Sequence, residues 1–264
     1  GWAMDLHMLN EMRRTLVPIL CTALLFSCAK EDPAVPDAPA PSPSTGLVKV
    51  NVRPVWNGVP FNKTNVYLSA GDERILLQQV KFYLSRITLV ADAGARELSD
   101  AELLDITNGA VSRVFTTDTG MVDSLRFGLG LPPDLNATDI TTVPPNDPLG
   151  NNGGMYWTWA SMYRFLIFDG RFDTDPSASG TPPFPFSIHT GRDTCYRHTT
   201  LPLQLSISAS DTARIDLDVD LARFFTDGNV ILKMSDGSQS HGEVEELGQA
   251  LKLSDLAIKA VQLQ

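Results

Sequence analysis

Basic residues are in short supply in this chain: 21 Lys and Arg stand against 31 Asp and Glu, which gives a net charge of −10. Nucleic acids and anionic membrane surfaces are bound through basic surfaces, so we expect neither as a direct partner of the folded part. The same charge is compatible with binding a cation. Histidine and cysteine are also scarce, with four and three residues, so a cluster of them is informative.

Familiar catalytic spacings are absent from the sequence. It contains no Gly-x-Ser-x-Gly, no His-Glu-x-x-His and no glycine-rich phosphate loop, and each of these motifs places groups that its chemistry requires. Gly128-Leu129-Gly130 lacks the third glycine of a dinucleotide-binding turn. We therefore expect that the protein is not an enzyme.

An export signal is predicted near the start of the sequence. Arg13-Arg14 precede an apolar run from Leu16 to Phe26, which is too short to span a bilayer as a mature helix and has the basic-then-apolar order of a secretory signal. Leu25-Phe26-Ser27-Cys28 resembles the lipobox of bacterial lipoproteins, in which Cys28 is lipidated and becomes the first residue. Met12 is then the natural start, and residues 1–27 hold upstream residues and the signal peptide.

A spacer follows the predicted lipidation site. Residues 28–46 are rich in Pro, Ala and Ser and contain no aromatic residue. Such a segment buries too little apolar surface to fold and behaves as an extended tether. The sequence therefore predicts an outer-membrane lipoprotein, held to the membrane by a lipid on Cys28 and facing the periplasm or the cell surface. Its folded domain is expected to span residues 47–264.

Alternation of apolar and polar residues dominates this domain and predicts β-strands. Residues 132–154 are rich in Pro, Asn, Asp and Gly, which indicates a long loop. Helical spacing of Val244, Leu247 and Leu251 predicts a short C-terminal helix. The expected fold class is all-β, a β-sandwich-like domain with Greek-key-type connections and long loops. The segments with the clearest strand patterns are residues 48–53, 80–90, 124–130, 201–207 and 215–221.

The most aromatic stretch is residues 155–168, which hold two of the four Trp and two of the five Tyr. As a strand it would place Trp157 and Trp159 on one face, and both faces are largely apolar, so we predict a central strand covered on two sides. An alternative is that Trp157 and Trp159 form an exposed aromatic site for a glycan or peptide, near loops at one end of the sandwich. A third interpretation is a structural surface protein without a small ligand.

Metal-ligand chemistry is concentrated in His189, Cys195 and His198, spaced His-x5-Cys-x2-His. Cys195 is the thiol that is left once the signal is removed and the lipobox cysteine is modified. Two imidazoles and a thiolate suit Cu(I) or Zn(II), and the thiolate favours the softer ion. The alternative is that His189 is a core or loop histidine and that its neighbours are incidental.

Ordered motifs across the domain resemble the MbnP-like family of exported copper-binding proteins. The most specific are Met155-Tyr156-Trp157-Thr158-Trp159 and the Phe-x-x-His-x-Gly from Phe186 to Gly191. The resemblance extends from about Val48 to Phe225. Other segments that carry it are Val80–Ile87, Leu104–Ile106, Leu125–Gly130, Pro145–Leu149 and Ile215–Leu221.

The resemblance implies an all-β protein that captures or buffers copper in the periplasm or at the cell surface. Some relatives bind copper with two histidines and an oxidised tryptophan that forms with help from a diheme partner, so a diheme-type redox protein is an expected partner. His189 is similar to the histidine of the Phe-x-x-His-x-Gly motif and is carried over as a copper ligand. In relatives the oxidised tryptophan lies two residues before a histidine, and no Trp-x-His occurs here. We therefore expect His189 to bind copper with His198 and Cys195.

Overall fold

The computed structural model describes residues 44–157, 162–241 and 247–264. Contacts divide the chain into Gly1–Pro41 and Ser42–Gln264, and the described residues belong to the second unit. The predicted signal peptide, the lipidation site and nearly all of the predicted spacer lie outside the described residues. Within the described ranges, no helix combines the length and apolar character needed to cross a membrane.

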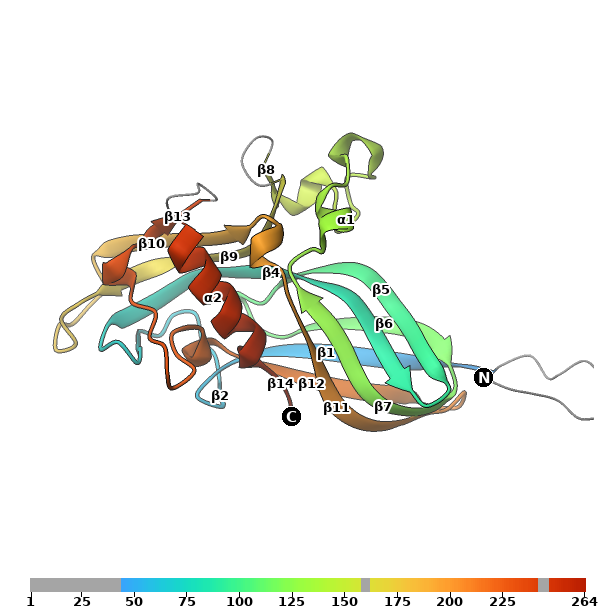
Figure 1. Ribbon diagram of the computed structural model, residues 1–264. Helices are drawn as coiled ribbons and strands as arrows, with labels where there is room; N and C mark the ends of the chain where they lie inside the picture. The colour runs from blue at the N-terminus through green and yellow to red at the C-terminus, as the bar shows by residue number, and fades with distance from the viewer. Residues whose placement is uncertain (1–43, 158–161, 242–246) are drawn as a thin grey trace, which may run out of the picture. The chain divides into compact units, whose positions relative to one another are not determined.

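Two β-sheets form the domain (Figure 1). The smaller sheet has the order β14-β12-β1-β2, and β6 also pairs with β1. β1 pairs in parallel with β12, which comes much later in the chain. Valines of β1 and apolar residues of β12 face the same core. The strands are β1 (Thr45–Trp56), β2 (Val59–Pro60), β6 (Val111–Asp118), β12 (Thr212–Asp220) and β14 (Val261–Leu263).

The larger sheet has the order β11-β7-β4-β9-β10-β13, with β3 and β5 also on β4 and β8 on β9. The all-β, sandwich-like class predicted from the sequence is confirmed. These strands are β3 (Tyr67–Leu68), β4 (Arg74–Ala91), β5 (Gly94–Asp105), β7 (Gly120–Leu129), β8 (Tyr156–Trp157), β9 (Met162–Asp173), β10 (Phe184–Gly191), β11 (Arg197–Ile207) and β13 (Gln239–Ser240).

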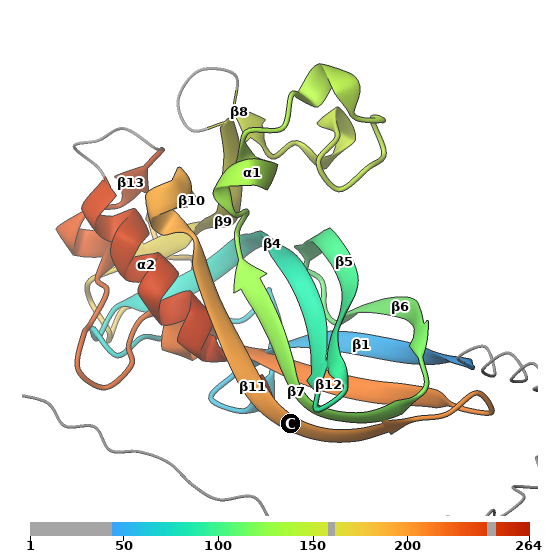
Figure 2. The same ribbon diagram turned by 45° about the vertical axis from the view of Figure 1, so that its right-hand side comes forward.

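The long strand β4 organises the larger sheet. β9 pairs with its first part, Arg74–Phe82, and β7 pairs with its second part, Leu84–Val90. β5 pairs with residues 81–91, which overlap both parts, so β9 and β7 lie one after the other along the opposite edge of β4. The connections from β7 to β9 and from β10 to β11 therefore leave the sheet at the same level. Figure 2 shows α1 and β8 rising from this region.

Two apolar cores result from this arrangement. The main core lies between the sheets and includes Phe82, Phe127 and Phe168. A second core lies on the outer face of the larger sheet and is built around Tyr83, Tyr163, Met155, Phe165 and Cys195. The predicted C-terminal helix is confirmed as α2 (Leu247–Ala260), which contributes to both cores.

The aromatic stretch does not form the single strand expected over residues 155–168. Trp157 pairs with Met162 and Tyr156 with Tyr163, in antiparallel register, so the chain reverses and the stretch supplies two strands, β8 and β9. An apolar pattern on both faces fits a covered strand and a folded-back hairpin equally well, and Met162 has the left-handed φ of 63° that a reversal allows. Trp159 lies outside the described residues.

The predicted long loop is tied down by buried polar groups. The phenol of Tyr83 donates to the carbonyl of Pro148 at 2.7 Å, and that of Tyr163 donates to Leu149 at 2.9 Å. Burial raises the pKa of both phenols, that of Tyr163 to about 12. The side chain of Asn136 donates to Asp193 and accepts from the backbone N–H of Tyr163. Short helices in the loop are α1 (Pro133–Asn136), η1 (Ile140–Thr142) and η2 (Asn151–Gly153).

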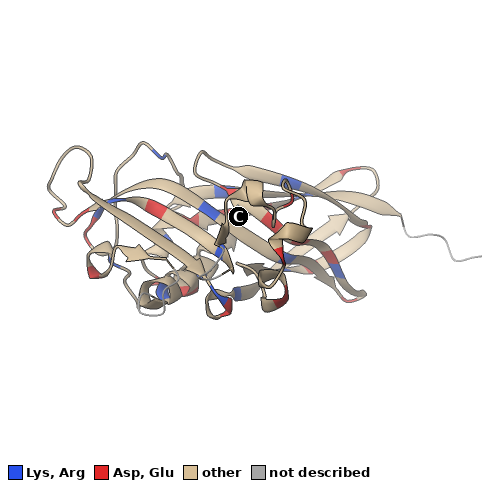
Figure 3. Ribbon diagram, turned by 90° about the horizontal axis from the view of Figure 1, so that it is seen from above, with Lys and Arg blue, Asp and Glu red and all other residues tan. Residues whose placement is uncertain are grey.

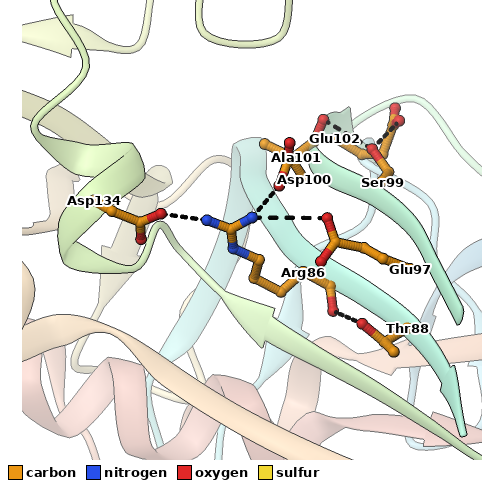
Figure 4. Close-up of polar contacts among 8 residues, drawn as sticks. All are labelled: Arg86, Thr88, Glu97, Ser99, Asp100, Ala101, Glu102 and Asp134. Carbon is orange, nitrogen blue, oxygen red and sulfur yellow. Dashed lines mark hydrogen bonds and ion pairs between the residues drawn. The ribbon is translucent and has the colours of Figure 1, made fainter. Parts of the chain in front are cut away.

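Arg86 fastens this loop to the sheet (Figure 4). Its guanidinium donates to Asp100 on β5 and Asp134 on α1, and it lies 3.7 Å from Glu97. Burial raises the pKa of Glu97, and the nearby carboxyl of Asp100 raises it further. Arg86 has φ of 49° where the register of β4 shifts, so the irregularity of the strand is held by an ion cluster.

Charged residues elsewhere are distributed along both sheets, and basic and acidic positions are interspersed in the view of Figure 3. Arg53 on β1 pairs with Asp218 on β12 at 2.6 Å, and Arg113 on β6 pairs with Glu102 on β5 at 2.8 Å. The first pair joins two paired strands of the smaller sheet, and the second joins a strand of the smaller sheet to a strand of the larger sheet.

Candidate metal site

Strands β9 and β10 place three polar side chains on the outer face of the larger sheet. Ser187 is the cross-strand partner of Asp169, and His189 is the partner of Ile167. Since alternate residues of a strand share a face, Ser187 and His189 point to the same side. Ile188 between them points into the main core. The sequence thus presents a hydroxyl, a carboxylate and an imidazole together on one face.

Hydrogen bonds fix the tautomer of His189. Asp169 Oδ1 lies 2.9 Å from Nε2 of His189 and accepts from the hydroxyl of Ser187 at 2.8 Å. An ionised carboxylate only accepts, so Nε2 of His189 carries the hydrogen and Nδ1 carries the lone pair. This Nδ1 is buried and has no hydrogen-bond partner in the described part of the chain.

A second imidazole, that of His241, lies beside the first. β13 pairs in parallel with β10, matching Gln239 with Ser187, and His241 follows directly after β13. The ring centroids of His241 and His189 are 5.0 Å apart. Nε2 of His241 lies 3.1 Å from the Ser187 hydroxyl. Because that hydroxyl gives its hydrogen to Asp169, its oxygen accepts from Nε2–H of His241.

The spacing of the two rings suits a shared ion. Ligand nitrogens lie about 2.0 Å from a bound Zn²⁺ or similar ion, which places each imidazole centre roughly 3 Å from it. A centroid separation of 5.0 Å is within the roughly 6 Å that two imidazoles bound to one ion can span. Imidazole nitrogens are the donors that copper and zinc sites use.

Trp157 forms a third side of this site. Its ring centroid lies 5.6 Å from that of His189 and 5.8 Å from that of His241. The pairing of β8 with β9 brings the half-buried indole there. The guanidinium carbon of Arg164 lies 5.1 Å from the Trp157 ring centroid, a cation–π contact.

The Asp169–Ser187–His189 set is not a hydrolytic triad. In a triad the serine and the carboxylate bind opposite nitrogens of the histidine. Here Ser187 and Asp169 both lie within hydrogen-bond distance of the same nitrogen, Nε2, so the opposed arrangement of a triad is not formed. A carboxylate that holds one nitrogen while the other stays available is instead the arrangement found behind metal-ligating histidines.

The ligand set predicted from the sequence does not come together. Cys195 lies in η3 (Asp193–Cys195) and is buried in the second core, and His198 is exposed on β11 with its ring 6.3 Å from that of Tyr196. Among the described residues, no group of three or more His, Cys, Asp or Glu side chains could hold a metal ion. His189, Cys195 and His198 therefore do not form such a group, and the candidate set is corrected to His189 with His241.

Sequence reasoning missed His241. The pairing of β13 with β10 places His241 near His189. β13 has two residues, too few for a periodic pattern in the sequence. The one available signal was the scarcity of histidine outside residues 189–198. The alternative site for a glycan or peptide, formed by Trp157 and Trp159 together, stays a prediction because Trp159 lies outside the described residues. Trp157 itself lies beside two imidazoles.

The protein is thus a sandwich-like all-β domain in which two imidazoles lie side by side on the outer face of the larger sheet. A family model described as MbnP matches residues 45–241, and the chain belongs to this family. Among solved structures, MbnP from Methylosinus trichosporium matches with a TM-score of 0.45 and 17% sequence identity, covering 78% of this chain and 87% of that chain. No curated protein sequence matches the chain.

Proposed function

We propose that this protein captures or buffers copper by binding the ion between His189 and His241. The observation that carries the proposal is Nδ1 of His189, which is buried and lacks a hydrogen-bond partner within the described residues, beside a second imidazole at 5.0 Å. A buried polar atom without a partner costs free energy, and a bound ion would remove that cost. Membership of the MbnP family supports copper as the ion.

The donor set also favours copper. Imidazole nitrogens bind Cu more tightly than the earlier divalent ions of the first row and more tightly than Zn. Cys195 is buried in the second core, so we assign the binding to nitrogen donors. Some relatives complete their site with an oxidised tryptophan that lies two residues before a histidine. Trp157 lacks that sequence pattern, but it lies close enough to both rings for us to propose it in that role. The redox partner would then be a diheme-type protein.

The proposal includes export and anchoring. Lipidation at Cys28 would hold the domain at the outer membrane through the spacer of residues 28–46, facing the periplasm or the cell surface. There it would bind copper without catalysing a reaction. Its acidic charge favours the approach of cations.

Copper titration tests the proposal most simply, using the exported chain with Cys28→Ser so that it is soluble. We expect one copper ion per chain. His189→Ala should abolish this binding, whereas the matched variant His198→Ala should bind like the parent. Binding should weaken in acid, because protons compete for the imidazole nitrogens. Stoichiometric binding that His189→Ala leaves unchanged would overturn the proposal.

A further inference from the structure

The guanidinium of Arg164 is fixed beside the proposed copper site. It lies 5.1 Å from the centroid of the Trp157 ring, the same ring that lies within 6 Å of both imidazoles. The side chain donates to the carbonyl of Gly154, and its backbone N–H donates to Met155 at 2.7 Å. Both bonds join β9 to the two residues that directly precede β8, so the side chain is held at two points.

This charge is partly desolvated. Burial lowers the pKa of Arg164, while nearby Asp169 acts in the opposite direction, and an arginine stays protonated at neutral pH. Nε of Arg164 is buried and has no hydrogen-bond partner in the described ranges. Asp169 directs the oxygen Oδ1 to Ser187 and His189. A partly desolvated cation therefore acts on the site across the indole ring.

We propose that Arg164 sets the oxidation state of the bound copper and favours Cu(I) over Cu(II). The inference rests on the proposed copper-binding function. When Cu(I) gives one electron to an acceptor it becomes Cu(II), and the added positive charge is repelled by the guanidinium. Repulsion grows with the charge of the ion, so the divalent state is destabilised more than the monovalent state. The carboxylate of Asp169, which lies 2.9 Å from Nε2 of His189, acts in the opposite direction, and it is the same in the parent and in variants of Arg164.

Spectroelectrochemical titration of the copper-loaded chain, with one-electron mediators as acceptor and donor, tests the inference. Arg164→Gln removes the charge, and we expect the ratio of Cu(I) to Cu(II) affinity to fall about tenfold, which lowers the midpoint potential by about 59 mV. Arg164→Lys keeps the charge and should stay within about twofold of the parent. Arg171→Gln is the matched control, because Arg171 is on the same strand but donates to Pro182 at 2.7 Å.

An unchanged ratio in Arg164→Gln, or an equal change in Arg171→Gln, would overturn the inference. Arg164→Met keeps the aliphatic stem and provides the same test if Arg164→Gln does not fold. Failure of the parent chain to bind copper would overturn the proposed function and this inference with it. Copper binding with a ratio insensitive to residue 164 would overturn this inference alone.

Discussion

The hydroxyl of Ser187 lies 3.1 Å from Nε2 of His241, although the two residues are 54 positions apart in the sequence. The same hydroxyl donates to Asp169 at 2.8 Å and lies 3.0 Å from Nε2 of His189. One serine therefore connects a carboxylate to both imidazoles. Since the carboxylate only accepts, the hydroxyl donates to Asp169 and accepts from Nε2–H of His241. Nδ1 of His189 has no hydrogen-bond partner among the described residues.

Loss of the second imidazole should disable the site. We expect His241→Ala to weaken copper binding by more than about 100-fold, because it removes a direct ligand, whereas changes behind a ligand typically cost about 10- to 100-fold. Cys195→Ser should keep the affinity of the parent, since the thiol is buried in the second core. Competition with a chromophoric copper chelator measures both. Parent-like affinity in His241→Ala would exclude this residue as a ligand.

The serine and the aspartate should act as positioning residues. Asp169→Asn and Ser187→Ala each break the chain that fixes the imidazole tautomers, and we expect each to lower copper affinity by about 10- to 100-fold. Ser187→Thr retains a hydroxyl and should restore most of the binding. The same chelator competition provides the measurement. Equal affinity in Ser187→Ala and the parent would show that the hydrogen-bond chain has no role in binding.

The fold should lose stability in alkali through its buried tyrosines. Burial, followed by the neighbouring Tyr156, raises the pKa of Tyr163 from 10.0 to about 12. The folded state then holds the phenolic proton more tightly than the unfolded state, so this contribution to stability is complete below pH 10 and is lost as the pH rises through about 12. Tyr83, with its pKa raised in the same way, adds to the trend.

Urea unfolding at pH 8 and pH 11 measures this dependence. Tyr163→Phe leaves the buried carbonyl of Leu149 without its phenolic donor, which should cost about 1–2 kcal/mol at pH 8. The variant should then lose less stability than the parent between the two pH values. Equal losses in the two proteins would contradict the assignment to Tyr163.

Removing the charge of different carboxylates around Arg86 should have unequal effects on the stability of the fold. Partial desolvation of its carboxyl and the nearby Asp100 raise the pKa of Glu97, so its contribution to stability is present below the unfolded pKa of about 4.5 and is lost as the pH rises through the folded value. At pH 7 we expect Glu97→Gln to be neutral or stabilising by at most about 0.5 kcal/mol, because the group is exposed and screened. Asp100→Asn removes a direct partner of Arg86 and should destabilise.

Denaturant unfolding of both variants at pH 7 separates these effects. An equal loss of stability in Glu97→Gln and Asp100→Asn would contradict this account. It would show that the attraction of Glu97 to Arg86 outweighs its desolvation and its repulsion by Asp100.

Local periodicity was sufficient to predict much of the fold. Alternation in residues 48–53 and 215–221 marked β1 and β12, and leucines with helical spacing marked α2. The reversal between Trp157 and Met162 was not predictable, because the apolar pattern continues through it. His241 could not be placed, because its position depends on the parallel pairing of β13 with β10, which no local pattern records. His189 was identified from its motif, and its partner was not.

The central claim is that His189 and His241 bind one ion. Anomalous X-ray scattering from crystals of the copper-loaded protein tests it directly. The account predicts a single copper peak about 2 Å from a ring nitrogen of each histidine, beside Trp157. A copper peak at His198 or Cys195, or one that touches neither His189 nor His241, would contradict it.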